Sequence, residues 1–213
     1  MKLIALLSLV GGVLWAADKR IEKLEDEKTH RVAVGFPQCV NNPSEIEEIL
    51  SAMKANSKGK NKYSGYRKAL SHDSDQQLVA RLIYAETLAA NCPSQSREVL
   101  PLIARVISNR IQIRKDGVKS VVYERDQFAS SLNKYSSSRY LDFLCPNNYE
   151  LWGLAFDHAG KGVSERSSIA VHYFLYKHHP GWDAEPWRLP ESRESLASKV
   201  RDCIRVFDNN TWK

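Results

Sequence analysis

The strongest helix signal in the chain lies in residues 74–90, SDQQLVARLIYAETLAA. Asp73 or Ser74 can cap the first turn, because a short polar side chain there accepts a hydrogen bond from a backbone N–H that the helix leaves free. Apolar residues then recur at helical spacing up to about Ala90. We therefore expect a long helix here that opens the main domain of the protein.

The acidic residue Glu86 stands on the apolar stripe of this helix. Leu78, Leu82 and Glu86 follow one another at intervals of four, so the carboxylate takes a place where another leucine would be expected. A carboxyl group on a buried face loses hydration, which penalises its charged form. A carboxylic acid that stays protonated near neutral pH can donate a proton to a leaving oxygen, as glycosidic cleavage requires. The alternative is an acid that turns back to water or pairs with Arg105 or Arg110.

The other patterns predict a chain that is mainly α (α+β), with little sheet. Apolar residues at helical spacing indicate most of the elements, whereas alternation and aromatic residues indicate one short strand. The predicted elements are a helix beginning after Asn42, helices at 96–113, 149–159 and 191–207, a short extended or helical piece at 118–123, a loop at 129–139, a strand at 169–176 and an irregular binding loop at 177–190.

The first residues have the order of a secretory signal peptide. Lys2 supplies a positive start, residues 3–15 are apolar, and the small residues Ala16 and Ala17 precede a charged run. The apolar run is shorter than the roughly 20 residues that span a bilayer. We predict that residues 1–16 are a signal peptide, that the protein is secreted or periplasmic, and that it has no stable membrane insertion after cleavage. An uncleaved N-terminal anchor is the alternative.

The rest of the chain is predicted to have two parts. Residues 17–70 form a charged helical N-terminal extension with a basic linker, and residues 71–213 form the main domain. The basic run from Lys54 to Lys68 contains Tyr63 and Tyr66, and such a run can hold a phosphate backbone while tyrosines stack on bases. We interpret the run as a solvated linker and expect no nucleic-acid partner.

Composition limits the class of protein without identifying it. Of 213 residues, 43% are hydrophobic and 26% are charged, which fits a folded globular protein and excludes a wholly disordered chain. The net charge of +6 suits a polyanionic partner, for which nucleic acid, a membrane surface and an acidic cell-wall polymer are all candidates. We expect a monomer that needs no cofactor.

Four cysteines remain after the predicted signal peptide, namely Cys39, Cys92, Cys145 and Cys203. They lie far apart and form no C-x-x-C pair, so neither a zinc ribbon nor a thioredoxin-like site is indicated. An even number in an exported chain favours two disulfides, for which three pairings exist. We favour Cys39 with Cys92 and Cys145 with Cys203, against the alternative of four reduced thiols.

Four strings of the sequence together resemble a known family. They are LVARLIYAET at 78–87, VLPLIARVISNRI at 99–111, SVVYERDQFAS at 120–130 and AVHYFLY at 170–176. In this order they are similar to the SleB/CwlJ-type cell-wall hydrolases, which are spore-cortex-lytic enzymes and their relatives. The resemblance covers residues 76–131 well and residues 150–188 loosely.

The resemblance implies a small lysozyme-like helical domain that cuts peptidoglycan between N-acetylmuramic acid and N-acetylglucosamine. The catalytic Glu of the family corresponds to Glu86, and Gln127 and Phe128 are implied to line the glycan cleft. The late aromatic patch corresponds to His172, Tyr173 and Phe174. Family members are usually lytic transglycosylases, and we favour that reaction over a hydrolytic muramidase.

The chain departs from the family pattern at two positions. Ala90 stands where the family often has a second Glu, and Ala129 stands where a Ser follows Q-F, with Ser130 next to it. We take Ser130 as a candidate contact for the substrate. No second acid is marked by spacing; Glu124 and Asp126 are the nearest candidates. With one acid, the 6-hydroxyl of the sugar can attack in place of water and give a 1,6-anhydro product.

Aromatic side chains are expected to stack on the sugar rings, since they offer apolar area with a polar edge. The candidates are Tyr84, Phe128, Tyr173, Trp182 and Trp187.

Two other functions remain possible from the sequence. A metal-dependent amidase or peptidase could draw ligands from His158, His172, His178 and His179, although these histidines lack the short, defined spacing of a metal site, and we predict no metal. A non-catalytic basic module that binds cell wall or nucleic acid would fit the charge but leaves Glu86 unexplained.

Overall fold

The computed structural model describes residues 35–57, 61–114, 117–124, 128–133, 138–162, 170–175, 199–200 and 204–208. The chain divides into two units, Met1–Phe36 and Pro37–Lys213, and nearly all of the described residues belong to the second. The described part is mostly helical, which confirms the prediction of a mainly α protein. The predicted signal peptide lies outside the described residues. Within them, no helix combines the length and the apolar composition needed to cross a membrane.

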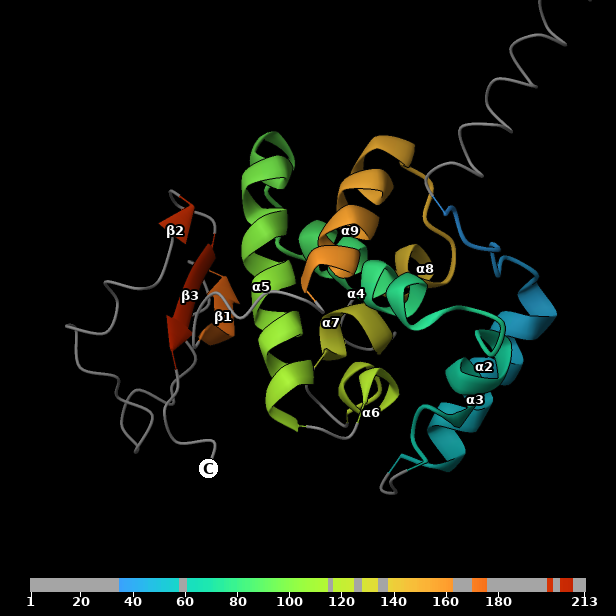
Figure 1. Ribbon diagram of the computed structural model, residues 1–213. Helices are drawn as coiled ribbons and strands as arrows, with labels where there is room; N and C mark the ends of the chain where they lie inside the picture. The colour runs from blue at the N-terminus through green and yellow to red at the C-terminus, as the bar shows by residue number, and fades with distance from the viewer. Residues whose placement is uncertain are drawn as a thin grey trace, which may run out of the picture. The chain divides into compact units, whose positions relative to one another are not determined.

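The helix predicted from the opening stretch is present as α4, Asp75–Ala89, and it is the central element of the fold. Ser74 caps it through a capping box, in which Ser74 Oγ accepts from the backbone N–H of Gln77 and the Gln77 side chain accepts from the backbone N–H of Ser74. All residues from Leu78 to Thr87 are buried, so the helix has neighbours on every side. Figure 1 shows α4 in the middle of the helices that contact it.

Two long helices pack against α4. They are α5, Ser96–Arg114, and α9, Tyr149–Gly162, both at the predicted positions, although α9 continues past Gly160, where the glycine predicted an end. Trp152 of α9 is buried and its ring lies 6.4 Å from that of Tyr84 in α4. Aromatic packing between these two helices therefore forms one side of the core.

The segment interpreted as a linker is part of the folded unit. Helix α2, Pro43–Ala55, is capped by Asn42 and is followed by α3, Ser64–Ala69. Gly65 lets these helices approach closely, because a Cβ at this position would stand 2.7 Å from the Cα of Ile49. Residues from Pro37 onward belong to one unit, so these helices share that unit with the residues that follow the predicted boundary at 70/71. Among the described residues of the run, Lys54 and Lys68 are exposed, whereas Lys62 and both tyrosines are buried.

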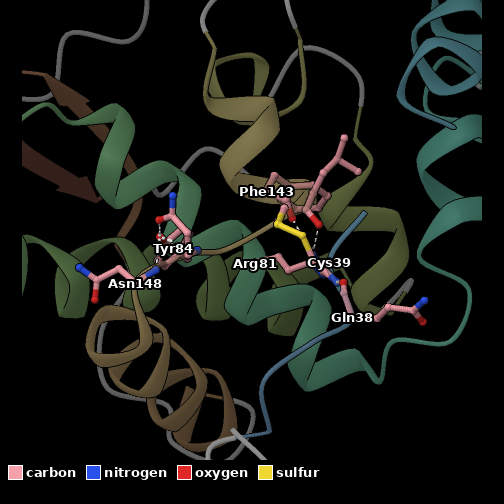
Figure 2. Close-up of a disulfide and its surroundings, with 9 residues drawn as sticks. Gln38, Cys39, Arg81, Tyr84, Phe143 and Asn148 are labelled. Atoms are coloured by element: carbon pink, nitrogen blue, oxygen red, sulfur yellow. Dashed lines mark hydrogen bonds between the residues drawn. A yellow bond between two sulfur atoms is a disulfide. The ribbon is translucent and has the colours of Figure 1, made fainter. Parts of the chain in front are cut away.

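The predicted disulfide pairing is also wrong. Cys39 bonds to Cys145, with 4.4 Å between their Cα atoms, and Cys92 is bonded in a separate disulfide. The Cys39–Cys145 bond joins the segment before α2 to the end of α8, Arg139–Leu144. Figure 2 shows this disulfide beside Arg81 of α4. The prediction of disulfides as such is supported, whereas the choice of partners depends on which chain segments pack together.

Arg81 is fully buried and fastens the same two segments to α4. Its guanidinium donates to the carbonyl oxygen of Gln38 at 2.6 Å and to those of Phe143 and Leu144 at 2.9 and 2.7 Å (Figure 2). It also forms an ion pair with Asp73, with 2.5 Å from Nε to Oδ2 and 3.5 Å from the second nitrogen to Oδ1. These contacts use all five N–H donors of the side chain.

Three short helices complete the helical part that the structure describes. They are α6, Val118–Val122, α7, Ala129–Leu132, and α8, and they come after a single 3₁₀ turn at Pro93–Gln95. The loop predicted over 129–139 is thus corrected, because α7 lies within it and α8 begins at its end. A four-residue helix has too few positions to show apolar periodicity, which explains why the pattern gave no sign of α7.

A small antiparallel sheet comes after the helices in the chain. Its strands are β1, Ala170–Leu175, β2, Lys199–Val200, and β3, Ile204–Asp208, in the order β1-β3-β2. The strand predicted over 169–176 is present as β1, whereas the helix predicted over 191–207 is wrong, since β2 and β3 occupy its end. Residues 204–207 are mostly β-branched or aromatic, and pairing with β1 decides in favour of a strand.

Candidate functional site

The candidate site is built around the side chain of Glu86, near the carboxyl end of α4. Glu86 is 4% exposed, which confirms the burial predicted from its place on the apolar stripe. Its neighbours in the same helix, from Leu82 to Thr87, are buried as well. A carboxyl group in this position has exchanged water for protein atoms, so the contacts that the protein gives it decide its orientation.

The hydroxyl of Ser131 supplies one of these contacts. Ser131 Oγ donates a hydrogen bond of 2.6 Å to Oε1 of Glu86, across 45 positions of sequence, and Ser131 is 0% exposed. A separation of this size lies within the normal range for a hydroxyl that donates to an oxygen acceptor. The bond fixes one oxygen of the carboxyl group against α7 and thereby limits the rotamers that Glu86 can adopt.

Ser131 was not among the residues predicted from the sequence, which instead pointed to Ser130. Both serines stand in α7, and the side chain that reaches Glu86 comes from the position one further along the chain. Of these two side chains the structure describes that of Ser131, and it is the one that bonds to Glu86. The contact between Ser131 and Glu86 is therefore a finding of the structure, and the predicted contact of Ser130 with the substrate stays a prediction.

Phe128 lies directly before α7 and is buried. The guanidinium carbon of Arg110 lies 5.1 Å from the centre of its ring, an arrangement typical of a cation–π contact. The ring thus packs between α7 and α5 in the described structure. A ring that is 1% exposed and lies against Arg110 has no open face for a sugar, which corrects the prediction that Phe128 stacks on one.

Tyr84 has a structural role that differs from the predicted one. Its side chain is buried, its hydroxyl donates to Oδ1 of Asn147 at 2.9 Å, and it accepts from the backbone N–H groups of Asn147 and Asn148 at 3.2 and 3.1 Å (Figure 2). Burial raises the pKa of Tyr84, so the hydroxyl stays protonated and keeps donating. A ring enclosed in this way has no face to offer to a sugar, which corrects the sequence prediction.

The structure describes only part of the remaining residues that were predicted to contact the substrate. Gln127, Trp182 and Trp187 lie outside the described residues, and for Ser130, His172, Tyr173 and Phe174 the structure describes the backbone alone. His172 and Tyr173 stand in β1, paired with Phe207 and Val206 of β3. Their contribution to a glycan cleft stays a prediction.

Of the four histidines in the rival metal hypothesis, the structure describes the side chain of His158. His158 lies in α9, where burial and the nearby charge of Lys161 lower its pKa. In the part of the chain that the structure describes, no three side chains of His, Cys, Asp or Glu form a group that could hold a metal ion. His178 and His179 lie outside that part.

A cavity of about 480 Å³ lies between α2, α3 and the start of α4, away from Glu86. Cys39, Ile49, Gly65 and the buried pair of Asp73 and Arg81 contribute to its lining. Because every N–H of Arg81 is already bonded within the protein, this arginine is not free to bind a ligand in the cavity. The candidate chemistry of the described residues is therefore centred on Glu86.

Comparison of the chain with models of protein families, with curated proteins and with solved structures gave no match.

Proposed function

We propose that this protein is an exported enzyme that cuts the glycan strands of peptidoglycan between N-acetylmuramic acid and N-acetylglucosamine, with Glu86 as its single general acid and base. The observation that carries the proposal is a buried carboxyl group on the central helix, held by the hydroxyl of Ser131 at 2.6 Å. The likeness of residues 76–131 to the SleB/CwlJ-type cell-wall hydrolases supports the same assignment.

The proposed reaction begins with proton transfer from the carboxyl group of Glu86 to the oxygen that joins the two sugars. Cleavage of the bond from the sugar carbon to that oxygen leaves positive charge on the ring, as in other glycosidic cleavages. The 6-hydroxyl of the same sugar then attacks the ring carbon and gives its proton to the Glu86 carboxylate. The product is a 1,6-anhydro sugar, and Glu86 returns to its protonated form. One carboxyl group is enough, because the attacking group is part of the substrate.

Ser131 contributes to this reaction by orientation. A catalytic acid has to lie within hydrogen-bond reach of the oxygen that it protonates, and free rotation of a Glu side chain works against that. The hydrogen bond from Ser131 holds Oε1 in one place, so the carboxyl group spends more time in a single orientation. Since Ser131 touches Glu86 and no reacting atom, it is a positioning residue.

The test replaces Glu86 with glutamine. The amide oxygen can still accept the hydrogen bond from Ser131, so the fold is expected to persist, whereas the amide cannot serve as an acid of comparable strength. We expect Glu86→Gln to bind peptidoglycan but to lose at least about a hundredfold in cleavage rate. Glu98→Gln, at an exposed position in the first turn of α5, is the matched control and should cleave like the unaltered protein.

Mass spectrometry of the digests separates the candidate reactions. Anhydro-muropeptides support the lytic transglycosylase, reducing muropeptides point to a hydrolytic muramidase, and cut peptide stems would instead indicate an amidase or peptidase. A chelator should leave the activity unchanged, and a loss would favour the metal-dependent rival. Undiminished wall breakdown by Glu86→Gln would refute the proposal in all its forms.

A further inference from the structure

We infer that Tyr66 of α3 is a positioning residue for the Glu86 site, because its hydroxyl holds the helix that carries Ser131. The inference rests on the proposed function for its catalytic consequence. It extends the site to the segment that the sequence indicated to be a linker, 66 residues before the group it contacts. No motif points to this residue, and only the tertiary structure brings it to α7.

The contact is made between the Tyr66 hydroxyl and the backbone carbonyl of Leu132. Tyr66 is 0% exposed, and its hydroxyl donates a hydrogen bond of 2.8 Å to that oxygen. Leu132 is the residue next to Ser131, whose own hydroxyl bonds to Glu86. Two consecutive residues of α7 are thus fixed, one against α3 and the other against α4.

Helix α7 depends on such contacts because it is very short. It has four residues, and the N–H groups of Ser131 and Leu132 both bond back to the carbonyl of Phe128, at 3.1 and 3.0 Å. The last carbonyls of a helix have no partner within it, and a single turn is unstable in isolation. The carbonyl of Leu132 receives its donor from Tyr66, so the position of the whole turn is set from α3.

Tyr66 is itself held firmly. Its ring lies edge-on to that of Phe143 in α8, with 5.8 Å between the ring centres, and edge-on to that of Tyr63 at 6.1 Å. Burial raises the pKa of Tyr66, so the hydroxyl stays protonated near neutral pH and remains a donor. A phenylalanine would fill the same space, and the hydroxyl adds the bond to α7.

The test uses Tyr66→Phe, Ser131→Ala, the double variant and a matched control. Tyr123→Phe is the control, because the Tyr123 hydroxyl is also buried but has no hydrogen-bond partner among the described residues. The first measurement is the titration of the Glu86 carboxyl carbon by NMR, assigned with Glu86→Gln. The second is kcat and KM for peptidoglycan cleavage.

We expect Tyr66→Phe to move the midpoint of the Glu86 titration in the same direction as Ser131→Ala. It should also lower kcat about fivefold with KM unchanged, which corresponds to the net contribution of one hydrogen bond. The double variant should match Ser131→Ala, since both changes act through the same bond. Tyr123→Phe should behave like the unaltered protein. A Glu86 titration in Tyr66→Phe that equals that of the unaltered protein would overturn the inference, as would effects that add fully in the double variant.

The two measurements separate this inference from the proposed function. If the unaltered protein does not cut peptidoglycan, the proposed function fails, while the titration still decides whether Tyr66 acts on Glu86. If Tyr66→Phe does not fold, the rate at which the Tyr66 hydroxyl proton exchanges with water is measured in Ser131→Ala instead. Coupling between two sites is reciprocal, so loss of the Ser131 hydroxyl should also affect Tyr66. Faster exchange than in the unaltered protein supports the link, and an unchanged rate refutes it.

Discussion

Replacing Arg81 with alanine is expected to destabilise the protein more than any change at its surface. Arg81 is 0% exposed, and its side chain is bonded to Asp73 and to the carbonyl groups of Gln38, Phe143 and Leu144. The variant leaves the Asp73 side chain, which is 7% exposed, without its cation. It also leaves three carbonyl oxygens without these donors, on two segments that the disulfide still joins.

The largest part of the stability lost in Arg81→Ala comes from removing one partner of a buried ion pair, which typically costs about 3–5 kcal/mol. Each orphaned carbonyl adds a desolvation penalty of about 1–3 kcal/mol in isolation. Water that enters the vacated space hydrogen-bonds to some of these groups and lowers the penalty, so we expect a total loss of about 5 kcal/mol. Domains are stable by about 5–15 kcal/mol, and the loss therefore consumes a third or more of the stability.

Urea unfolding followed by far-ultraviolet circular dichroism measures the effect. Arg97→Ala is the matched control, because Arg97 forms an ion pair with Glu150 in which both side chains are largely exposed, at 74% and 68%. Exposed pairs contribute about 0–1 kcal/mol, so this variant should unfold nearly like the unaltered protein. Adding Asp73→Asn to Arg81→Ala should restore part of the loss, because it removes the unpaired charge.

The reasoning is refuted if Arg81→Ala loses no more stability than Arg97→Ala. That result would mean that the contacts of Arg81 replace equally good contacts with water and contribute nothing net. A double variant that is less stable than Arg81→Ala alone would also contradict it, since the charge on Asp73 would then not be the source of the cost.

Three further predictions concern the same framework. Replacing Cys39 and Cys145 together with serine removes a cross-link across 106 positions and should cost about 4–5 kcal/mol in the chain-entropy model, so a melting temperature within a degree or so of the original would contradict that account. Burial raises the pKa of Tyr66 and Tyr123 above the value of about 10 that tyrosines have in an unfolded chain. The contribution of these two residues to the free energy of unfolding is therefore fully present below that pH and is lost as the pH rises above it. Tyrosinate absorbance and circular dichroism should therefore change together, and ionisation of all nine tyrosines in a folded chain would argue against it. Gly65→Ala places a Cβ 2.7 Å from the Cα of Ile49, which should force α2 and α3 apart at a cost of about 1–3 kcal/mol, and an unchanged urea midpoint would show that the helices separate freely.

Local patterns predicted the elements whose stability is local. The cap at Ser74 and the helical spacing after it define α4, and the position of Glu86 on the apolar stripe predicted that its carboxyl would be buried. Capping and side-chain periodicity act over one or two turns, so they can be recognised without knowing what packs against the helix. The same holds for α5 and α9, which are long enough to show the pattern.

The partners of these residues were decided by the tertiary structure. Ser131 reaches Glu86 across 45 positions, Tyr66 reaches Leu132 across 66, and Cys39 bonds to Cys145 across 106. Likewise, β3 became a strand because β1 and β2 pair with it, against a helical prediction for the same residues. Contacts between distant residues depend on how buried surfaces fit together, and local propensity yields to that packing wherever the two disagree.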